Sequence, residues 1–144
     1  MDRTKNHHYF KHLLRDHLRE SFPQLAEDIK LINQRAKWAV NAYEGALAAG
    51  NPENQCLEIA RYILFEGFHF SRFDTVLEVL CHEFTDLIPV GERRAFALKV
   101  MPLCEVVFAR YELTDDFAYN IEHNLLYREL KETIEKRIKD HGIQ

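Results

Sequence analysis

One short stretch in the middle of the chain, residues 67–74, constrains the fold more than any other. Gly67 can adopt the left-handed backbone conformation that ends a helix, and Ser71 can cap the next helix by accepting a hydrogen bond from the backbone N–H of Asp74. Aromatic side chains crowd both sides of this link. The stretch therefore predicts two consecutive helices whose junction lies in a core.

Helical periodicity extends over most of the chain, because apolar residues recur at intervals of three and four positions. The expected helices cover about residues 6–20, 23–49, 53–67, 72–87, 92–101 and 121–140. Pro102 either kinks the fifth helix or starts a separate one, and the sequence does not choose between these alternatives. The pattern predicts an all-α fold, with residues 1–144 forming a single domain of about six helices packed as an irregular or orthogonal array.

Several helix ends carry their own signals. Gly50 is suited to end the second helix, and Asn51 is expected to cap the third, with Pro52 and Glu53 in its first turn. The acid in the first turn also suits the positive end of the helix dipole. Asn120 is expected to cap the last helix in the same way.

The second helix is expected to start at Pro23, with Ser21 or Phe22 just outside it. It carries the only tryptophan, Trp38, near its middle. Trp38 is expected to belong to the core with its indole N–H paired, and a role as an anchor for a partner is the alternative.

Composition and charge exclude several classes of protein. The net charge of −4 argues against a general nucleic-acid binder, whose affinity depends on a basic face that neutralises phosphates. No uncharged apolar run approaches the ~20 residues that span a bilayer, so we expect no membrane association and a cytoplasmic protein. The three cysteines, Cys56, Cys81 and Cys104, each lie in an apolar helical pattern, which indicates buried reduced thiols rather than disulfides.

Two sets of side chains have the spacing of metal ligands. His8 and His12 are four residues apart, and Glu78, His82 and Asp86 follow one another at the same interval on the expected fourth helix. A zinc site needs three or four protein ligands, and neither set is completed by neighbours in the pattern of a zinc protease helix. Solvated helix faces explain both sets, so we predict no metal site and no cofactor.

The segment from Tyr111 to Asn120 is the least regular in the chain and combines acids with aromatics. Asp115 and Asp116 could hold a divalent cation, but the ligand spacing of a calcium-binding loop is missing, and helix capping by Thr114 or Asp115 is favoured. Loops on a rigid scaffold often carry function. Together with the aromatic junction, the segment predicts an interaction surface made of Phe68, His69, Phe70, Arg72, Tyr111, Asp115, Asp116 and Tyr119.

Two stretches, residues 69–80 and 108–119, carry a resemblance that extends over nearly the whole chain. They read HFSRFDTVLEVL and FARYELTDDFAY, and they resemble an uncharacterised family of small bacterial domains of unknown function. The resemblance implies a compact all-helical domain, often found near mobile or conjugative elements, with no assigned activity, cofactor or catalytic residue. It therefore supports the fold and transfers no functional residue to this chain.

Three functions fit these observations. The preferred one is a non-enzymatic protein-interaction or accessory domain, linked to mobile elements, with a protein partner or a second copy of the chain bound at the predicted surface. A metal-dependent hydrolase-like enzyme is an alternative, and it would use His69, Glu78, His82 and either Asp115 or Asp116. An accessory DNA-binding protein is another, and its basic residues would be Arg3, Lys5, Lys11, Arg15 and Arg19.

Overall fold

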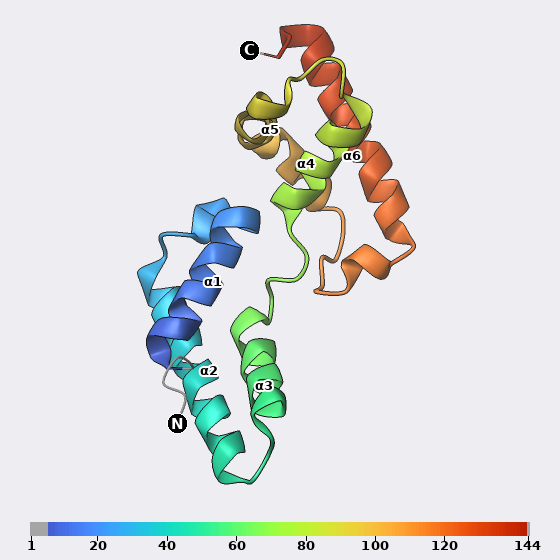
Figure 1. The fold of residues 1–144 in the computed structure, drawn as a ribbon. Coiled ribbons are helices and arrows are strands. Elements are labelled where there is room, and N and C mark those ends of the chain that lie inside the picture. The colour runs from blue at the N-terminus through green and yellow to red at the C-terminus, as the bar shows by residue number, and fades with distance from the viewer. Residues whose placement is uncertain (1–5, 144) are drawn as a thin grey trace. The chain divides into compact units, whose positions relative to one another are not determined.

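The computed structural model describes residues 6–143, and this part of the chain is helical, with no strand (Figure 1). The helices are α1 (His7–Ser21), α2 (Ile29–Ala48), α3 (Glu53–Phe65), α4 (Arg72–Glu83), α5 (Arg93–Phe108) and α6 (Glu122–His141). Three short 3₁₀ turns lie between them, namely η1 (Pro23–Leu25), η2 (Val90–Glu92) and η3 (Phe117–Tyr119). The prediction of an all-α fold with about six helices is confirmed.

The chain divides into two compact units, which we call the N-terminal unit (residues 1–69) and the C-terminal unit (residues 70–144). In the N-terminal unit α2 packs against both α1 and α3, and in the C-terminal unit α5 packs against both α4 and α6. Each unit has a hydrophobic core of its own. The two units form a single domain only if they are joined into one body. The single-domain assignment of residues 1–144 therefore stays a prediction.

The junction between the units contains the two predicted signals. Gly67 has a φ of 86°, and the Ser71 hydroxyl accepts the backbone N–H of Asp74 at 2.9 Å. The residues at the junction belong to a core as expected, but to two different ones. Phe68 belongs to the core of the N-terminal unit and Phe70 to the core of the C-terminal unit, so the junction separates two cores.

The second helix begins later than the periodicity predicted. Pro23–Leu25 forms a 3₁₀ turn, and α2 begins at Ile29. The reason is Asp28, whose carboxylate accepts the backbone N–H of Leu31 at 3.1 Å and so caps the helix at this point.

Asn51 does not cap α3 through its side chain as predicted. Its Nδ2 donates instead to the carbonyl oxygen of Ala46 at 3.0 Å, and its backbone N–H donates to the same oxygen at 3.1 Å, so Asn51 satisfies a carbonyl at the end of α2. The predicted cap of the last helix by Asn120 is wrong as well, because Ile121 occupies the capping position of α6 and the helix has no side-chain cap. The side-chain oxygen of Asn120 accepts the backbone N–H of Glu122, the first residue of α6, at 2.8 Å.

Trp38 is 48% exposed, so the prediction that it belongs to the core is wrong. It lies on α2 away from the buried positions Ile32, Ala36, Ala39 and Tyr43. Two of those buried residues are alanines, which lets α3 pack closely against this side of the helix. The Arg35 guanidinium lies 5.9 Å from the Trp38 ring.

Two predictions about the C-terminal unit are settled by its helix ends. α4 ends at Glu83 rather than near Leu87, so Asp86 lies beyond the helix. α5 is one helix from Arg93 to Phe108, and it continues through Pro102. Proline removes one helical N–H, which leaves the carbonyl of Leu98 without its partner within the helix, and exposure of both residues lets water take that place.

All three cysteines are free thiols, and Cys56 and Cys104 are buried as predicted, whereas Cys81 is only half-buried. Burial raises the pKa of the Cys104 thiol to about 12. No helix within residues 6–143 is both long enough and apolar enough to cross a bilayer.

Candidate interaction site

The residues of the predicted interaction surface fall in different environments. Phe68 and Phe70 are buried, with 7% and 9% of their surface exposed, and each serves the core of its own unit. His69, between them, is exposed. The two phenylalanines therefore contribute to stability within the units, and the exposed residues remain the candidates for contact.

The structure brings Arg72 and Tyr111 together at one pocket of the C-terminal unit. The pocket has a volume of about 310 Å³ and is lined by Arg72, Glu105, Phe108, Ala109, Tyr111 and Leu113. Arg72 is the first residue of α4, and its Nη1 donates to Oε2 of Glu105, on α5, at 2.9 Å. The pocket thus combines an apolar wall with a half-exposed ion pair.

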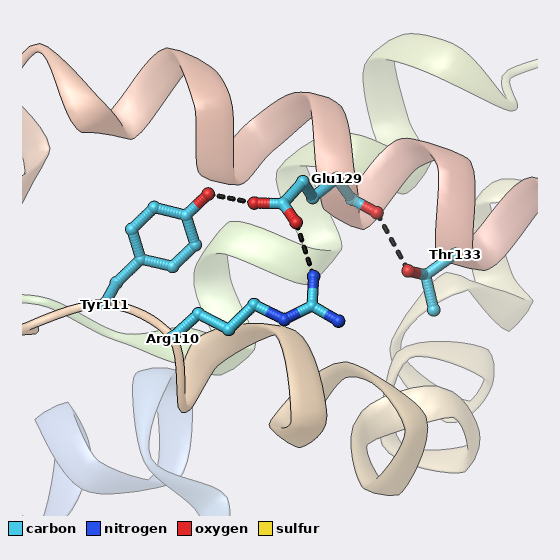
Figure 2. Close-up of polar contacts among 4 residues, drawn as sticks. All are labelled: Arg110, Tyr111, Glu129 and Thr133. Carbon is cyan, nitrogen blue, oxygen red and sulfur yellow. Dashed lines mark hydrogen bonds and ion pairs between the residues drawn. The ribbon is translucent and has the colours of Figure 1, made fainter.

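Tyr111 forms one wall of this pocket, and a hydrogen-bond network fixes the position of its side chain (Figure 2). The Tyr111 hydroxyl donates to one carboxylate oxygen of Glu129, on α6, and Nη1 of Arg110 donates to the other at 2.5 Å. The backbone carbonyl of Glu129 accepts the Thr133 hydroxyl at 2.8 Å. Burial, together with the hydrogen bond to Glu129, raises the pKa of Tyr111 to about 12, so the phenol stays protonated at neutral pH.

A second exposed feature leads to the pocket along α5. We call it the α5 outer face, and it consists of the exposed residues Ala95, Leu98, Pro102, Val106 and Ala109. These positions follow one another at intervals of three and four, so they share one side of the helix. The opposite side is also apolar and buried, with Phe96, Val100, Cys104 and Val107 in the core. Ala109 belongs to both the face and the pocket, so the two features are continuous.

Sequence reasoning missed the α5 outer face, although a signal for it was present. Between Ala95 and Ala109 the only charged residues are Lys99 and Glu105, so the helix has no polar side. A surface helix normally has a polar side facing solvent, and a helix that is apolar all round is normally covered on every side. Leu98 and Val106 are nevertheless 50% and 62% exposed.

The acidic segment after α5 does not adopt the predicted cap. The Thr114 hydroxyl donates to Oδ1 of Asp116 at 2.5 Å, and η3 has no side-chain cap. Asp115 is half-buried, and Tyr119 is 92% exposed. A role for these three acidic and aromatic residues in partner binding stays a prediction.

The candidate metal ligands of the sequence analysis do not come together in a three-ligand site within the described residues. Within residues 6–143 no group of three histidine, cysteine or acidic side chains is placed to hold a metal ion. Glu78 and His82 approach to 4.0 Å, but Asp86 lies beyond the end of α4. The rings of His8 and His12 stack edge to face with their centroids 4.4 Å apart.

The basic residues of the DNA-binding alternative are only partly within the described chain. Arg3 and Lys5 lie outside the described residues. Lys11, Arg15 and Arg19 all lie on α1, where Arg19 is exposed and the other two are half-buried.

The chain is similar to a solved structure and matches a family model. No protein with curated annotation matches the chain. Among solved structures, it is similar to the crystal structure of protein PG0816 from Porphyromonas gingivalis, with 33% sequence identity and a TM-score of 0.92 over 98% of this chain and 96% of that chain. The model of the family described as Domain of unknown function (DUF1896) matches residues 2–143. The chain therefore belongs to the DUF1896 family, which confirms the resemblance to a family of unknown function.

Proposed function

We propose that the chain is a non-enzymatic protein-interaction or accessory domain, and that the α5 outer face is its contact surface. The observation that carries the proposal is the exposure of Leu98 and Val106 on a helix whose other side is already buried in the core. Contiguous exposed apolar side chains are typical of protein interaction sites.

Burial of this face would supply useful binding energy. Fully burying a leucine or valine contributes roughly 1.5–3 kcal/mol, so covering two that are about half exposed contributes about 1 kcal/mol each. Leu103, which is 46% exposed at the edge of the face, adds to this. The pocket at the end of the face gives a partner a polar contact that fixes its position.

The proposal is tested in the cells that make the protein, with the untagged chain expressed from its own gene. Native mass spectrometry of the purified protein would compare the wild type with Val106→Glu and with the matched control Val90→Glu. Val90 is 75% exposed in η2, outside the α5 outer face, so the control introduces the same charge on the same residue type.

We expect the wild type and the Val90→Glu variant to retain a partner protein or a second copy, and the Val106→Glu variant to lose it. A charge placed in an apolar contact costs several kcal/mol when it is desolvated without a partner. Circular dichroism and thermal unfolding would show that both variants keep the wild-type fold. The proposal fails if all three proteins are isolated as bare monomers, or if Val106→Glu retains its partner.

A further inference from the structure

We infer that the occupant of the α5 outer face is an acidic amphipathic helix of a partner protein, with one of its carboxylates bound to Arg72 in the adjoining pocket. The inference rests on the proposed function and names the chemistry of the partner. Three observations support it: the charge around the face, the state of Arg72, and the length of the face.

The α5 outer face is surrounded by a small excess of cations in a chain whose net charge is −4. Residues 92–112 contain four cations, Arg93, Arg94, Lys99 and Arg110, and three acids, Glu92, Glu105 and Glu112. Arg94 lies four residues before Leu98, and Arg110 four residues after Val106, so a cation stands at each end of the face. A partner with acids beside its apolar stripe would match this border.

Two of these cations are held in place by the unit itself. The Arg94 guanidinium lies 4.8 Å from the centre of the Phe73 ring, and Arg110 is paired with Glu129 at 2.5 Å. Fixed side chains lose less conformational entropy on binding than free ones. Arg94 is therefore partly organised before a partner arrives, whereas the charge of Arg110 is already balanced by Glu129.

Arg72 can accept a second carboxylate. Its side chain is 49% exposed, and its contact with Glu105 runs through a single nitrogen, Nη1, at 2.9 Å. A guanidinium has five N–H donors, arranged so that it can bind a carboxylate through two parallel hydrogen bonds. A partner carboxylate could therefore join or displace Glu105 at the mouth of the pocket.

The pocket has room for an acidic side chain. Its volume of about 310 Å³ is roughly that of ten water molecules in the liquid. Phe108 and Leu113 give it apolar walls against which the methylene groups of a glutamate could pack. The acid of the partner and the aliphatic part of its side chain would thus both find complementary surface.

The dimensions of the face suit a helix. Ala95 and Ala109 are fourteen residues apart, which corresponds to about 21 Å along the axis of α5. A partner helix lying along this face needs apolar residues at positions i, i+3, i+4 and i+7, the pattern with which amphipathic helices fill apolar grooves. Peptides of about fourteen residues or more would cover it.

A second copy of the chain offers a poorer match through its most charged helix, α6. This helix buries its apolar stripe of Leu126, Leu130 and Ile134 within its own unit. Its charged residues are five acids and five bases, so it has no net negative charge to match the positive border. A separate acidic partner fits the border better.

The test uses the full chain and two synthetic peptides with the same leucine pattern. One carries glutamate and the other lysine at every position between the leucines, and fluorescence anisotropy would measure their binding at low and at physiological salt. The protein variants are Arg72→Gln, Glu105→Gln and Val106→Glu, with Val90→Glu as the control.

We expect the glutamate peptide to bind and the lysine peptide to bind at least tenfold more weakly. Arg72→Gln should weaken binding of the glutamate peptide by about twofold to fivefold, which is the upper part of the range for a half-exposed ion pair. Glu105→Gln should strengthen it by about threefold, because it removes a competing carboxylate. Salt should weaken binding of the acidic peptide. The opposite signs of the two substitutions separate this effect from a loss of folding.

Several results would overturn the inference while leaving the proposed function in place. Equal binding of both peptides would do so, as would an unchanged affinity in both Arg72→Gln and Glu105→Gln while Val106→Glu abolishes binding. A homodimer in native mass spectrometry that Val106→Glu dissociates would also replace the acidic partner by a second copy. The proposed function itself fails on the separate result from cells, namely if all three proteins are isolated as bare monomers or if Val106→Glu retains its partner.

Discussion

Arg35 shows how one side chain can complete a helix end. Its Nη1 donates to the carbonyl oxygen of Glu66 at 2.6 Å and lies 3.4 Å from the carbonyls of Ile63 and Leu64, the last carbonyls of α3. Its guanidinium also stacks over the Phe68 ring at 4.9 Å. A cation at this position satisfies carbonyls that have no partner within the helix and opposes the negative end of the helix dipole.

Replacing Arg35 with alanine should therefore destabilise the N-terminal unit. We expect the free energy of unfolding to fall by about 0.5–1.5 kcal/mol, the net contribution of a typical hydrogen bond, since the carbonyls that lose the charged donor are exposed or partly buried and water can reach them. Urea unfolding followed by circular dichroism would measure the change. Lys37→Ala, at an exposed position on the same helix, is the control and should change stability little. Equal losses in the two variants would contradict the capping role of Arg35.

The raised pKa values of two tyrosines predict that the protein loses stability at alkaline pH. Burial, followed by a hydrogen bond to a carboxylate, raises the pKa of Tyr111 and of Tyr127 to about 12. The folded state thus favours the neutral phenol relative to the unfolded state, where the pKa is near 10. The stabilisation is complete below pH 10 and is lost as the pH rises toward 12.

This pH dependence can be assigned to Tyr111 by substitution. The Tyr111→Phe variant should lose stability less steeply than the wild type between pH 10 and pH 12, as measured by denaturant unfolding at a series of pH values. Tyr119→Phe removes a phenol that is 92% exposed and serves as the control. An identical slope in the wild type and in Tyr111→Phe would exclude the proposed contribution.

At the scale of the element, α5 keeps a proline at an exposed interior position. Pro102 cannot donate to the carbonyl of Leu98, yet the helix continues to Phe108. Substituting alanine restores the missing N–H without adding charge to the α5 outer face. We expect the Pro102→Ala variant to be more stable by about 1–3 kcal/mol, because proline is roughly 3 kcal/mol less favourable than alanine within a helix. Chemical unfolding would detect this, and a destabilised variant would show that the proline is needed for the local geometry.

The start of α2 depends on its capping aspartate. Replacing Asp28 with alanine should lower stability by about 1 kcal/mol, the typical cost of losing an N-terminal cap. Glu27→Ala is the matched control, since it removes a neighbouring exposed carboxylate that makes no cap. A shift in the urea midpoint of similar size in both variants would indicate a general charge effect instead.

The helices and most of their ends could be predicted from the sequence because they depend on local chemistry. Ser71 caps α4 through a bond that spans only three residues. The start of α2 was missed because apolar periodicity continues past Pro23 and does not reveal which of several polar residues provides the cap. Trp38 was misplaced for a different reason. The neighbouring helices decide which side of a largely apolar helix is buried. The local sequence pattern does not show where those neighbours pack.

The candidate site was harder to predict than the fold. Arg72 and Tyr111 were identified from local composition, and the structure puts both at one pocket. Glu105, the partner of Arg72, lies 33 residues from it in the sequence, so only the packing of α4 on α5 brings the two charges together. The α5 outer face was missed because apolar positions alone do not distinguish a buried side from an exposed one.

At the scale of the whole molecule, the division into two units predicts two cores that can form separately. Phe70 and the residues after it complete the C-terminal core, with Leu126, Leu130 and Ile134 fully buried. A fragment of residues 70–144 should therefore keep its helical circular dichroism and unfold cooperatively on heating. The companion fragment, residues 1–69, should behave likewise, since its core includes Phe68. A fragment that is unfolded at low temperature would show that its core needs the other unit.

The exposed apolar side of α5 also affects the steady-state amount of the protein in a cell. If a partner normally covers Leu98 and Val106, each chain made without one is an orphan subunit that displays the kind of surface chaperones and proteases recognise. Its steady-state level would then follow the supply of its partner rather than its own rate of synthesis. Overproduction alone would raise turnover and aggregation, whereas joint production of the two proteins would raise the amount of both.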